Sequence, residues 1–506
     1  MNSGQGRLIV VSNRLPVNIE GDAGQRSLFA SSGGLVTALQ SVLRTQKVVW
    51  VGWPGAEDDG EVRHLLQNAS EELPYSFEPI FLSPEQVAGF YSGFSNEIVW
   101  PLFHDLQSRC RFDPSYWQTY IEVNRKFAET VARMVTPQDF VWVHDYHLML
   151  VGRYLREAGV ESTLGFFQHI PFPPPDIFEK LPWRSEILKS LLEFNVVGLQ
   201  TLRDRRNFNA CMRTLAPGVQ IHRNGERFLL EHQGRRCVAG NFAISIDFSE
   251  FSDQAASPEA TERAAKIKEE MGGKQIVLGV DRLDYTKGIP ERLRAYLHLF
   301  HHYPELRRRL ALVQIVVPSR EDLDKYKELK LEIEGLVSRI NGELTEPGWI
   351  PIHYLYRHLS RLELLAYYRA ADIALITPLK DGMNLVAKEF CASQVDENGV
   401  LILSEFAGAA PELKQGAMLV NPYDTEGVAE TLSRAFHMTD ERRSRMRRLR
   451  DVVRRNDVYR WADSFLLAAA AVHLPRIAKA RSLTRQFEPQ SLLFQYRRGQ
   501  QARAQS

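Results

Sequence analysis

Short apolar runs alternate with segments of mixed polarity in both halves of the chain. Runs of this length that end in turn residues are typical of buried strands, and the segments between them carry apolar residues at helical spacing. The expected strands are residues 8–12, 48–51, 140–144, 163–167 and 196–200 in the first half, and residues 275–280, 311–317, 352–355, 373–376 and 400–403 in the second. Strands separated by helices predict parallel sheets with helices on both faces.

Two such sets of strands predict two Rossmann-like domains of the α/β class. The helices expected in the first are residues 34–43, 116–134, 148–157 and 185–192. The pattern changes near residues 246–257, and a polar helix is predicted over residues 258–271. We therefore expect an N-terminal domain over residues 1–247 and a C-terminal domain over residues 248–456, with ligands at the carboxyl ends of the strands.

The composition argues against several classes of protein. The 506 residues are 44% hydrophobic and 25% charged with a net charge of +1, so we expect neither a nucleic acid nor a membrane surface as partner. The four cysteines lack metal-type spacing, which favours reduced thiols over a zinc site. No apolar run is long enough to span a bilayer, and residues 8–11 are too short for a signal peptide, so we expect a cytoplasmic protein.

Two cations follow the predicted strand at residues 275–280. They are Arg282 and Lys287, and Gly288 then opens a helix predicted over residues 291–300. Arginine offers a planar fork of donors, lysine a mobile point charge, and N–H groups at a helix start attract anions. The segment therefore fits a diphosphate site, although a surface loop with two solvated cations would contain the same residues.

A second segment with anion-binding character lies at residues 376–389, where a strand end gives way to a turn containing Asp381. The turn leads into a helix that begins with Asn384, Leu385 and Val386. Backbone N–H groups and the helix dipole favour an anion at such a start. Glu389 lies one turn further in, within reach of a ribose diol. A capped helix with an aspartate in its turn is the plain structural alternative.

Together with eight further blocks in the same order, these segments resemble the trehalose-6-phosphate synthase family of retaining GT-B glycosyltransferases. The ten blocks are residues 11–14 (VSNR), 32–34 (SGG), 50–53 (WVGW), 90–91 (FY) with 100–101 (WP), 142–147 (WVHDYH), 165–172 (GFFQHIPF), 282–287 (RLDYTK), 339–342 (RING), 381–389 (DGMNLVAKE) and 404–408 (SEFAG). The resemblance extends from residue 8 to about residue 461. It implies two domains facing across a cleft, last helices over residues 457–480 that cross back to the N-terminal domain, and a tail over residues 481–506.

The resemblance also implies the reaction. Glucose would pass from UDP-glucose, or another nucleotide glucose, to glucose 6-phosphate, giving trehalose 6-phosphate with retained configuration. Two same-fold alternatives have another acceptor: a glucosylglycerol-phosphate synthase and a pseudo-glycosyltransferase. A non-catalytic sugar-phosphate sensor is a third, which the presence of Arg282, Lys287 and Asp381 disfavours. The sequence leaves the nucleotide base and the oligomeric state open.

By the same resemblance, the acceptor's phosphate and ring belong to residues at several strand ends. These are Arg14, Tyr91, Trp100 and Arg320, with Trp53 alongside. The chemistry agrees, because arginine binds phosphate bidentately and a sugar face packs on an aromatic ring. Tyr91 and Trp100 could instead be core residues. Gly33 and Gly34 would let the backbone approach the donor closely, although a flexible turn would also use them.

On the donor side, the resemblance assigns the diphosphate to Arg282, Lys287 and the helix start at Asn384, Leu385 and Val386, and the ribose to Glu389. Asp381 and His169 would hold hydroxyls of the transferred glucose, and Asp145 would contact sugar hydroxyls on the acceptor side. Stabilisation of the leaving group by Arg282 and Lys287 needs no metal, so we expect neither metal nor cofactor.

Asp145 and His169 are then candidate catalytic residues beside the two cations. Asp145 could act as a nucleophile paired with a second acid, as in glycosidases. The sequence shows no second acid with a clear place opposite it, which favours a reaction on one face of the sugar. His144 and His147 flank Asp145, but His144 ends a strand, so we expect no metal pair.

The chain departs from the family pattern at three places. Ser245 stands in the hinge where glycine is usual, Asn195 where an acid often occurs, and Leu199 where phenylalanine is usual. These changes bear on hinge stiffness and helix packing rather than on the chemistry.

Overall fold

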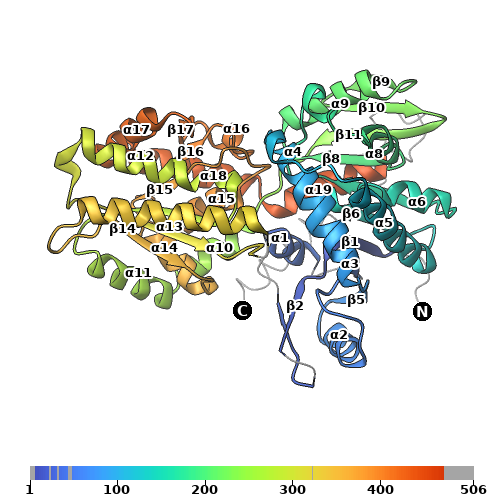
Figure 1. Ribbon diagram of the computed structural model, residues 1–506, viewed down its shortest axis with the longest axis horizontal. Coiled ribbons are helices and arrows are strands. Elements are labelled where there is room, and N and C mark those ends of the chain that lie inside the picture. Colours follow the sequence, from blue (N-terminus) through green and yellow to red (C-terminus); the bar gives the residue numbers. More distant parts are fainter. Residues whose placement is uncertain (1–5, 22–23, 31–33, 44–47, 322, 472–506) are drawn as a thin grey trace, which may run out of the picture. The chain divides into compact units, whose positions relative to one another are not determined.

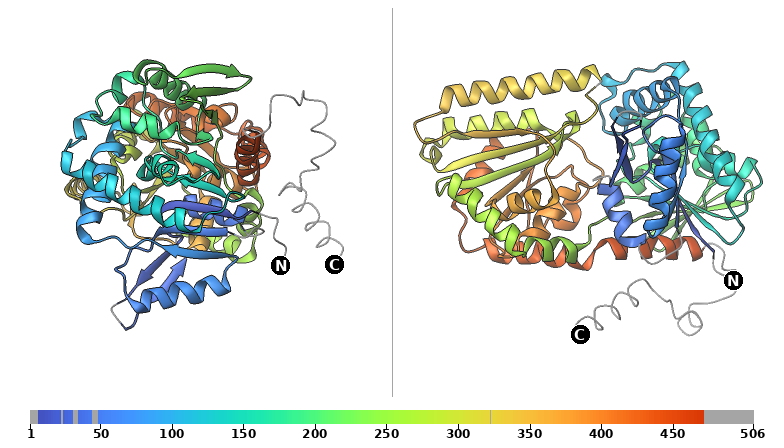
Figure 2. Two further views of the ribbon diagram at one scale, coloured as in Figure 1. Left: turned by 90° about the vertical axis from the view of Figure 1, so that its right-hand side faces the viewer. Right: turned by 90° about the horizontal axis from the view of Figure 1, so that it is seen from below.

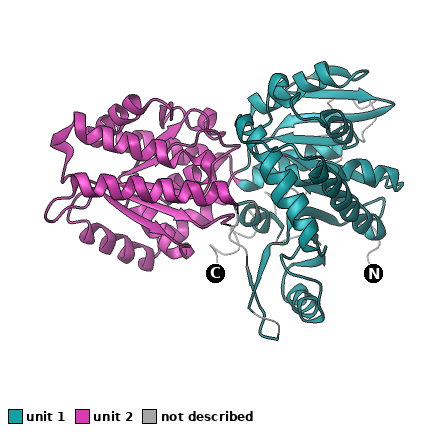
Figure 3. Cartoon of the chain, viewed as in Figure 1, with its two compact units in different colours: residues 1–244, 458–506 teal, residues 245–457 magenta. Residues whose placement is uncertain are grey.

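The computed structural model describes residues 6–21, 24–30, 34–43, 48–321 and 323–471. The chain forms two compact units, coloured separately in Figure 3. Unit 1 contains the residues up to Ile244 and those from Val458 onward, and unit 2 contains Ser245–Asp457. The predicted tail, residues 481–506, lies outside the described residues.

A largely parallel sheet forms the centre of unit 1. Within the described residues its strand order is β5-β4-β1-β6-β7-β8-β11-β10-β9, and β10 alone runs antiparallel to its neighbours. The strands are β1 (Leu8–Arg14), β4 (Val48–Trp53), β5 (Tyr75–Pro79), β6 (Phe140–His144), β7 (Thr163–Phe167), β8 (Val196–Leu199), β9 (Gln220–Asn224), β10 (Arg227–His232) and β11 (Arg235–Asn241), with a separate hairpin β2 (Val17–Glu20) and β3 (Ser27–Ala30). The order reverses between β1 and β6, which makes their carboxyl ends the expected ligand site.

Helices surround this sheet. They are α1 (Gly34–Leu43), α2 (Gly60–Glu72), α3 (Pro84–Gln86), the π-helix η1 (Val87–Val99), α4 (Trp100–Phe103), η2 (Gln107–Arg109), α5 (Pro114–Met134), η3 (Tyr146–Leu148), α6 (Val151–Glu157), α7 (Pro175–Phe178), α8 (Arg184–Leu191), α9 (Leu202–Leu215) and α19 (Val458–Ala471). The π-helix lies very close to α5, since a Cβ atom at Gly93 would be 2.6 Å from the Tyr116 ring. Glycine is therefore required at that contact.

Helix α19 packs on β7, β8 and α1 within unit 1 (Figures 1 and 2). The Phe465 ring stacks on the Trp142 ring with centroids 4.9 Å apart, and the centroid of the Trp461 ring lies 5.2 Å from that of Trp142. Gly165 in β7 and Gly198 in β8 make room, because a Cβ on either would come within 2.9 Å of the Phe465 ring. The end of the described chain thus supplies part of the core of unit 1.

Unit 2 is built on a fully parallel sheet. Its strand order is β14-β13-β12-β15-β16-β17. The strands are β12 (Gln275–Arg282), β13 (Leu310–Val317), β14 (Ile352–Tyr356), β15 (Ile373–Ile376), β16 (Val400–Ser404) and β17 (Met418–Val420). This order reverses between β12 and β15, so their carboxyl ends form the expected ligand site of this unit.

Helices cover both faces of this second sheet (Figure 2). Helix α12 packs against α13 and α17, while α14 packs against α11, and α15 against α10 and α18. Their bounds are α10 (Phe248–Ala255), α11 (Pro258–Glu270), η4 (Tyr285–Lys287), α12 (Ile289–His302), η5 (Pro304–Leu306), α13 (Asp324–Leu344), α14 (Arg361–Ala370), α15 (Leu385–Ser393), α16 (Ala410–Leu413), α17 (Thr425–His437) and α18 (Arg442–Arg455).

These sheets confirm the predicted fold class. A strand of unit 1 or unit 2 occupies every segment predicted as a strand. The predicted helix over residues 148–157 is shorter than expected, because a 3₁₀ turn precedes α6. No described helix combines the length and apolar character needed to cross a membrane.

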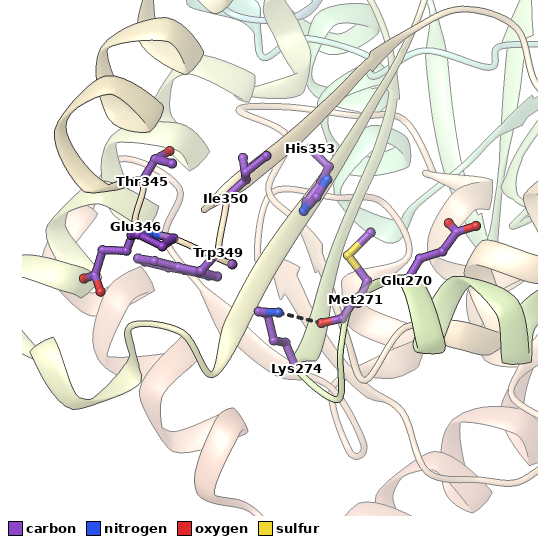
Figure 4. Close-up of a pocket in the computed structure, with 10 residues that line it drawn as sticks. Glu270, Met271, Lys274, Thr345, Glu346, Trp349, Ile350 and His353 are labelled. Carbon is purple, nitrogen blue, oxygen red and sulfur yellow. Dashed lines mark hydrogen bonds between the residues drawn. The ribbon is translucent and has the colours of Figure 1, made fainter.

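A cavity of about 570 Å³ opens in unit 2 (Figure 4). Its lining includes Lys274, which precedes β12, and His353 near the start of β14. Lys274 Nζ donates a hydrogen bond to the carbonyl of Met271 at 2.9 Å. The cavity therefore lies at the amino-terminal edge of the sheet, opposite the strand ends where the sequence predicts ligands.

Candidate active site

Four of the predicted functional residues end or follow the strands between which the strand order reverses. In unit 1, Arg14 ends β1 and Asp145 directly follows β6. In unit 2, Arg282 ends β12 and Asp381 follows β15. Ligands of open α/β sheets bind at these positions, so each unit has its candidate residues at the expected edge.

Arg14 lies over the ring of Trp53, with its guanidinium carbon 4.6 Å from the ring centroid. Burial lowers the pKa of Arg14. Gly55 has φ +84°, and a Cβ there would be 2.2 Å from the Arg14 guanidinium, so only glycine leaves room. Trp53 Nε1 is buried and has no hydrogen-bond partner among the described residues. Arg14 and Trp53 thus form a cationic and aromatic corner with a donor available to a ligand.

An aromatic row continues from this corner. Tyr91, on the π-helix η1, lies edge-on to Trp53 at 6.3 Å and stacks on His147 at 5.9 Å. His147 in turn contacts Tyr146, whose ring is 5.8 Å from Trp100. Tyr91 is partly exposed, whereas Trp100 is buried. The structure therefore brings Arg14, Trp53 and Tyr91 together and places Trp100 further into the core.

Asp145 has a backbone conformation that is rare for any residue except glycine, with φ 74° and ψ 167°. A side chain in this region costs about 1–3 kcal/mol, and such residues cluster at functional sites. Its carboxylate Oδ1 accepts a hydrogen bond from the backbone N–H of His169 at 3.1 Å. The strained turn after β6 and the turn after β7 are thus tied together through Asp145.

His169 belongs to a chain of buried polar groups. Its Nε2 lies 3.0 Å from Nδ1 of His144, and its Nδ1 lies 3.4 Å from the amide nitrogen of Gln200. Burial lowers the pKa of His169 to about 3. Burial, followed by repulsion from His169 when both rings carry a proton, lowers the pKa of His144 well below its ordinary value. Both rings are therefore neutral near pH 7. The Gln200 carbonyl oxygen accepts a hydrogen bond from Ile244 N–H, the last residue of unit 1 before unit 2.

In unit 2, Lys287 and Asp381 form an ion pair with Nζ and Oδ2 2.5 Å apart. The same carboxylate accepts hydrogen bonds from Asn384 Nδ2 at 3.2 Å and from Met383 N–H. Lys287 reaches this position from the loop after β12, and Asp381 from the loop after β15. The two predicted anion-binding segments therefore meet.

Helix α15 begins at Leu385, one residue later than predicted, because Asn384 is its capping residue. Asn384 is the cap, with φ 75°, and its Oδ1 accepts a hydrogen bond from Ala387 N–H at 3.1 Å. Gly408 packs on the preceding turn so tightly that a Cβ would be 1.8 Å from the carbonyl oxygen of Gly382. The block at residues 404–408 thus supports the turn that carries Asp381.

Unit 2 has two further cations and two further carboxylates in its predicted site segments. Arg282 is exposed at the end of β12. Arg320, with φ +50°, has its Nη1 3.6 Å from Oδ2 of the buried Asp284. Glu389 accepts a hydrogen bond from the Tyr368 hydroxyl at 2.8 Å, and burial raises the pKa of Glu389.

A buried arginine lies behind Lys287. Arg292, 1% exposed, forms an ion pair with Asp281 and donates hydrogen bonds to Gln314 Oε1 at 3.0 Å and Thr377 Oγ1 at 3.1 Å. Its Nη2 also lies 3.4 Å from the carbonyl oxygen of Lys287. Arg292 therefore braces the loops that follow β12 and β15.

The remaining predicted residues are placed as follows. Gly34 begins α1, and Gly33 lies outside the described residues. Leu385 and Val386 form the first turn of α15. In the described part of the chain, no three His, Cys, Asp or Glu side chains gather as metal ligands.

Comparison with known proteins assigns this arrangement to a family. The model of glycosyltransferase family 20 matches residues 6–471. The chain belongs to glycosyltransferase family 20. Family 20 relatives of this chain include a trehalose-6-phosphate synthase of Mycobacterium avium, 45% identical over 481 residues that cover 92% of this chain and 96% of the relative. A bifunctional trehalose-6-phosphate synthase/phosphatase of Thermoproteus tenax is 44% identical over 91% of this chain, which spans 63% of that protein's length.

Solved structures agree with this family 20 assignment. An α,α-trehalose-phosphate synthase (UDP-forming) from Burkholderia xenovorans, in complex with glucose-6-phosphate, superposes with a TM-score of 0.83 at 34% identity. The superposition covers 92% of this chain and 100% of the Burkholderia xenovorans chain. A trehalose-6-phosphate structure from E. coli, bound with UDP-2-fluoro glucose, gives a TM-score of 0.82 at 34% identity over 93% of this chain and 100% of that one. The predicted family and its GT-B architecture are confirmed.

Two departures from the family 20 pattern have a structural account. Asn195 Oδ1 accepts hydrogen bonds from Arg156 Nη2 and Leu164 N–H, both at 2.8 Å, so a neutral amide ties β7 to its neighbours where an acid is common. Leu199 is fully buried in β8. Ser245 is buried, and its hydroxyl has no hydrogen-bond partner among the described residues.

The sequence did not single out Asp284, Tyr326 or Arg292. Asp284 stands inside the 282–287 block, so its position was visible, but its partners Arg320 and Tyr326 come from the segment after β13. Arg292 resembles any charged residue near a helix start. The neighbouring sequence of Asp284, Tyr326 and Arg292 therefore does not indicate which residues they contact.

Proposed function

We propose that this protein transfers glucose from UDP-glucose to glucose 6-phosphate, giving trehalose 6-phosphate and UDP with retention at the anomeric carbon. The observation that carries the proposal is the similarity, over 92% of the chain, to UDP-forming synthases, one of them holding glucose 6-phosphate. A cytoplasmic location follows, because both substrates carry phosphates that partition poorly into a bilayer.

On the donor side, Lys287 and Arg282 hold the diphosphate, and the N–H groups of Leu385 and Val386 add to its binding. The Lys287 ammonium is already directed by Asp381, which leaves its other two protons for phosphate oxygens. Asp381 and His169 bind hydroxyls of the transferred glucose. Glu389 binds the ribose, and the Tyr368 hydroxyl fixes its carboxylate. Gly33 and Gly34 allow close approach of the backbone to the donor.

On the acceptor side, Arg14 binds the phosphate of glucose 6-phosphate, and Tyr91 and Trp53 contact the sugar. The unpartnered Trp53 Nε1 is a suitable donor to a hydroxyl or phosphate oxygen. Burial strengthens such a contact, since an ion in a low dielectric interacts more strongly than in water. Arg320 supplies a further cation for the phosphate, Trp100 supports the aromatic row, and Asp145 contacts sugar hydroxyls.

The chemical step exchanges one carbon–oxygen bond for another. A hydroxyl oxygen of glucose 6-phosphate bonds to the anomeric carbon while the bond from that carbon to the diphosphate breaks. The hydroxyl proton passes to the departing phosphate oxygen, so no separate base is required. Arg282 and Lys287 stabilise the charge that develops on the diphosphate, as preorganised donors do in other group transfers.

The test incubates the purified chain with UDP-glucose and glucose 6-phosphate and identifies the product by mass and linkage. A hexose disaccharide phosphate with an α,α linkage supports the proposal. Lys287→Ala lowers turnover by about 100-fold or more, the typical loss for one transition-state donor. Product from glycerol 3-phosphate but not from glucose 6-phosphate would replace the acceptor assignment. Absence of product with every nucleotide glucose would overturn the proposal that the protein is an enzyme.

A further inference from the structure

The buried carboxylate of Asp284 lies near Lys287 and Arg282 on its own segment and near Arg320 on another segment of unit 2. It is 1% exposed and accepts hydrogen bonds from Thr286 N–H at 3.0 Å and Thr286 Oγ1 at 2.9 Å. These bonds cap the 3₁₀ turn Tyr285–Lys287 at its start. Asp284 Oδ1 thus fixes the turn that presents Lys287.

The other oxygen of Asp284 contacts a different segment. Arg320 Nη1 lies 3.6 Å from Asp284 Oδ2, and the Tyr326 hydroxyl lies 3.4 Å from the same oxygen. Arg320 Nη1 also donates to the Tyr326 hydroxyl at 2.6 Å. Each of the three groups thus contacts the other two, and the Arg320 side chain is 8% exposed.

Arg320 is held in an unfavourable backbone conformation. Its φ of +50° is left-handed, a region that few residues other than glycine, asparagine and aspartate adopt. Such a conformation persists only where surrounding contacts fix it. Asp284 and Tyr326 are contacts of that kind, because they fix the guanidinium at the far end of the side chain.

Three cations act on the charge of Asp284. Burial by itself raises the pKa of a carboxyl group, but nearby cations bring the pKa of Asp284 below its ordinary value. These cations are Arg320, Lys287 and Arg282. Asp284 therefore stays ionised and acts on all three at once. Lys287 also forms an ion pair with Asp381.

We propose that Asp284 is a positioning residue that couples binding of the donor diphosphate to binding of the acceptor phosphate. One carboxylate oxygen sets the turn of Lys287, and the other sets the guanidinium of Arg320. A phosphate that draws Lys287 or Arg320 toward itself therefore shifts Asp284, and through Asp284 it changes the position of the other cation. The coupling rests on the proposed function, since it takes Lys287 as a donor ligand and Arg320 as an acceptor ligand.

Linkage gives the size of the expected effect. A coupling between two sites changes each affinity by the same factor, typically about 5- to 150-fold. Glucose 6-phosphate is therefore expected to bind at least about five-fold more tightly when UDP is saturating than when it is absent. Removing the charge of Asp284 reduces this ratio toward one.

The experiment measures the Kd of glucose 6-phosphate by calorimetry, with and without saturating UDP, for the whole chain and three variants. The ratio of interest is the Kd without UDP divided by the Kd with UDP. Asp284→Asn removes the charge and is expected to bring this ratio to about one, and Asp284→Glu is expected to restore part of the wild-type ratio. Asp372→Asn is the matched control, because Asp372 also accepts a backbone hydrogen bond, from Ile276 N–H at 2.8 Å, but at the amino-terminal end of the same sheet. That variant loses stability and keeps the wild-type ratio.

A milder variant covers the case in which Asp284→Asn does not fold. Tyr326→Phe removes only the hydroxyl that joins Arg320 to Asp284, and it is expected to lower the ratio at least two-fold. A wild-type ratio of one, or a ratio unchanged in the folded Asp284 or Tyr326 variants, overturns the coupling. Failure of the wild type to make any disaccharide phosphate would instead overturn the proposed function, so the two failures are distinct.

Discussion

Replacement of Asp145 by glycine and by alanine tests the strain at the candidate site. Both variants lose the carboxylate and its hydrogen bond to His169 N–H, so that loss cancels when they are compared. They differ only in the Cβ atom. With φ 74° and ψ 167°, a Cβ at this position is strained, while glycine adopts the conformation freely.

The expected difference follows from two opposing terms. Relief of the strain favours glycine by about 1–3 kcal/mol. The greater freedom of glycine in the unfolded chain favours alanine by about 0.4–1 kcal/mol. With mid-range values of about 2 and about 0.7 kcal/mol, Asp145→Gly should be more stable than Asp145→Ala by about 1.3 kcal/mol. In a unit of this size that difference shifts the melting temperature by roughly 3–5 °C.

The assay is differential scanning calorimetry of both variants, with activity measured on the same samples. Both should lose most of their turnover, because neither can hold a sugar hydroxyl. Glu129, exposed in the middle of α5, is the control position: there glycine should be less stable than alanine by about 1 kcal/mol. If Asp145→Ala melted as high as Asp145→Gly, the strained conformation would be refuted.

Three further predictions concern other parts of unit 1. Phe465→Ala should destabilise by about 3–5 kcal/mol, since its ring fills the space over Gly165 and Gly198, and a loss below 1 kcal/mol by denaturant titration would contradict the packing. Arg14→Ala should raise the KM for glucose 6-phosphate about ten-fold or more and leave the KM for UDP-glucose within two-fold, because the variant loses charged hydrogen bonds to one substrate. Steady-state kinetics in which both KM values rise equally would remove the acceptor role of Arg14. The pKa of His169 in the folded protein is about 3, below its value in the unfolded chain, so the unfolded chain takes up the proton first as the pH falls. The free energy of unfolding should therefore decrease below about pH 6.5, by up to about 1.4 kcal/mol per pH unit for each such histidine. His144→Leu should flatten this fall between pH 6.5 and 5, and an unchanged slope in denaturation at each pH would contradict it.

The strands of both units were predictable because their burial is nearly complete. Strands covered by helices on two faces are continuous apolar runs, such as residues 140–144 and 373–376, and every such run formed a strand. Strands β9 to β11 were not foreseen, because they mix arginine, glutamate and histidine with apolar residues. They are the last three strands on one side of the sheet, and β9 forms its edge. The π-helix η1 was missed as well, since its wider turn has no periodicity that a helical or strand pattern would detect.

The candidate site was predictable in its residues and not in its partners. Arg282, Lys287 and Asp381 could be found because cations and turns after strand ends are local signals. That Lys287 would pair with Asp381, or Arg320 with Asp284, depends on which strands become neighbours in the sheet. Sequence distance hides this: residues 284 and 320 meet only because β12 and β13 are adjacent and parallel.

Backbone strain shows why local sequence could not supply the rest. Asp145, Arg320 and Asn384 all have positive φ, yet none is glycine, the residue by which a left-handed position is ordinarily recognised. Each is fixed by contacts from another segment or by a cap: Asp145 by the turn after β7, Arg320 by Asp284 and Tyr326, and Asn384 by Ala387. A side chain is retained in these conformations at a cost in stability that a glycine would avoid. Positive φ by itself does not mark a site, since Asp105, Gln233, Arg308 and Glu397 share it. Asp145, Arg320 and Asn384 differ from those four because each also follows a parallel strand at its carboxyl end, where ligands of open α/β sheets bind.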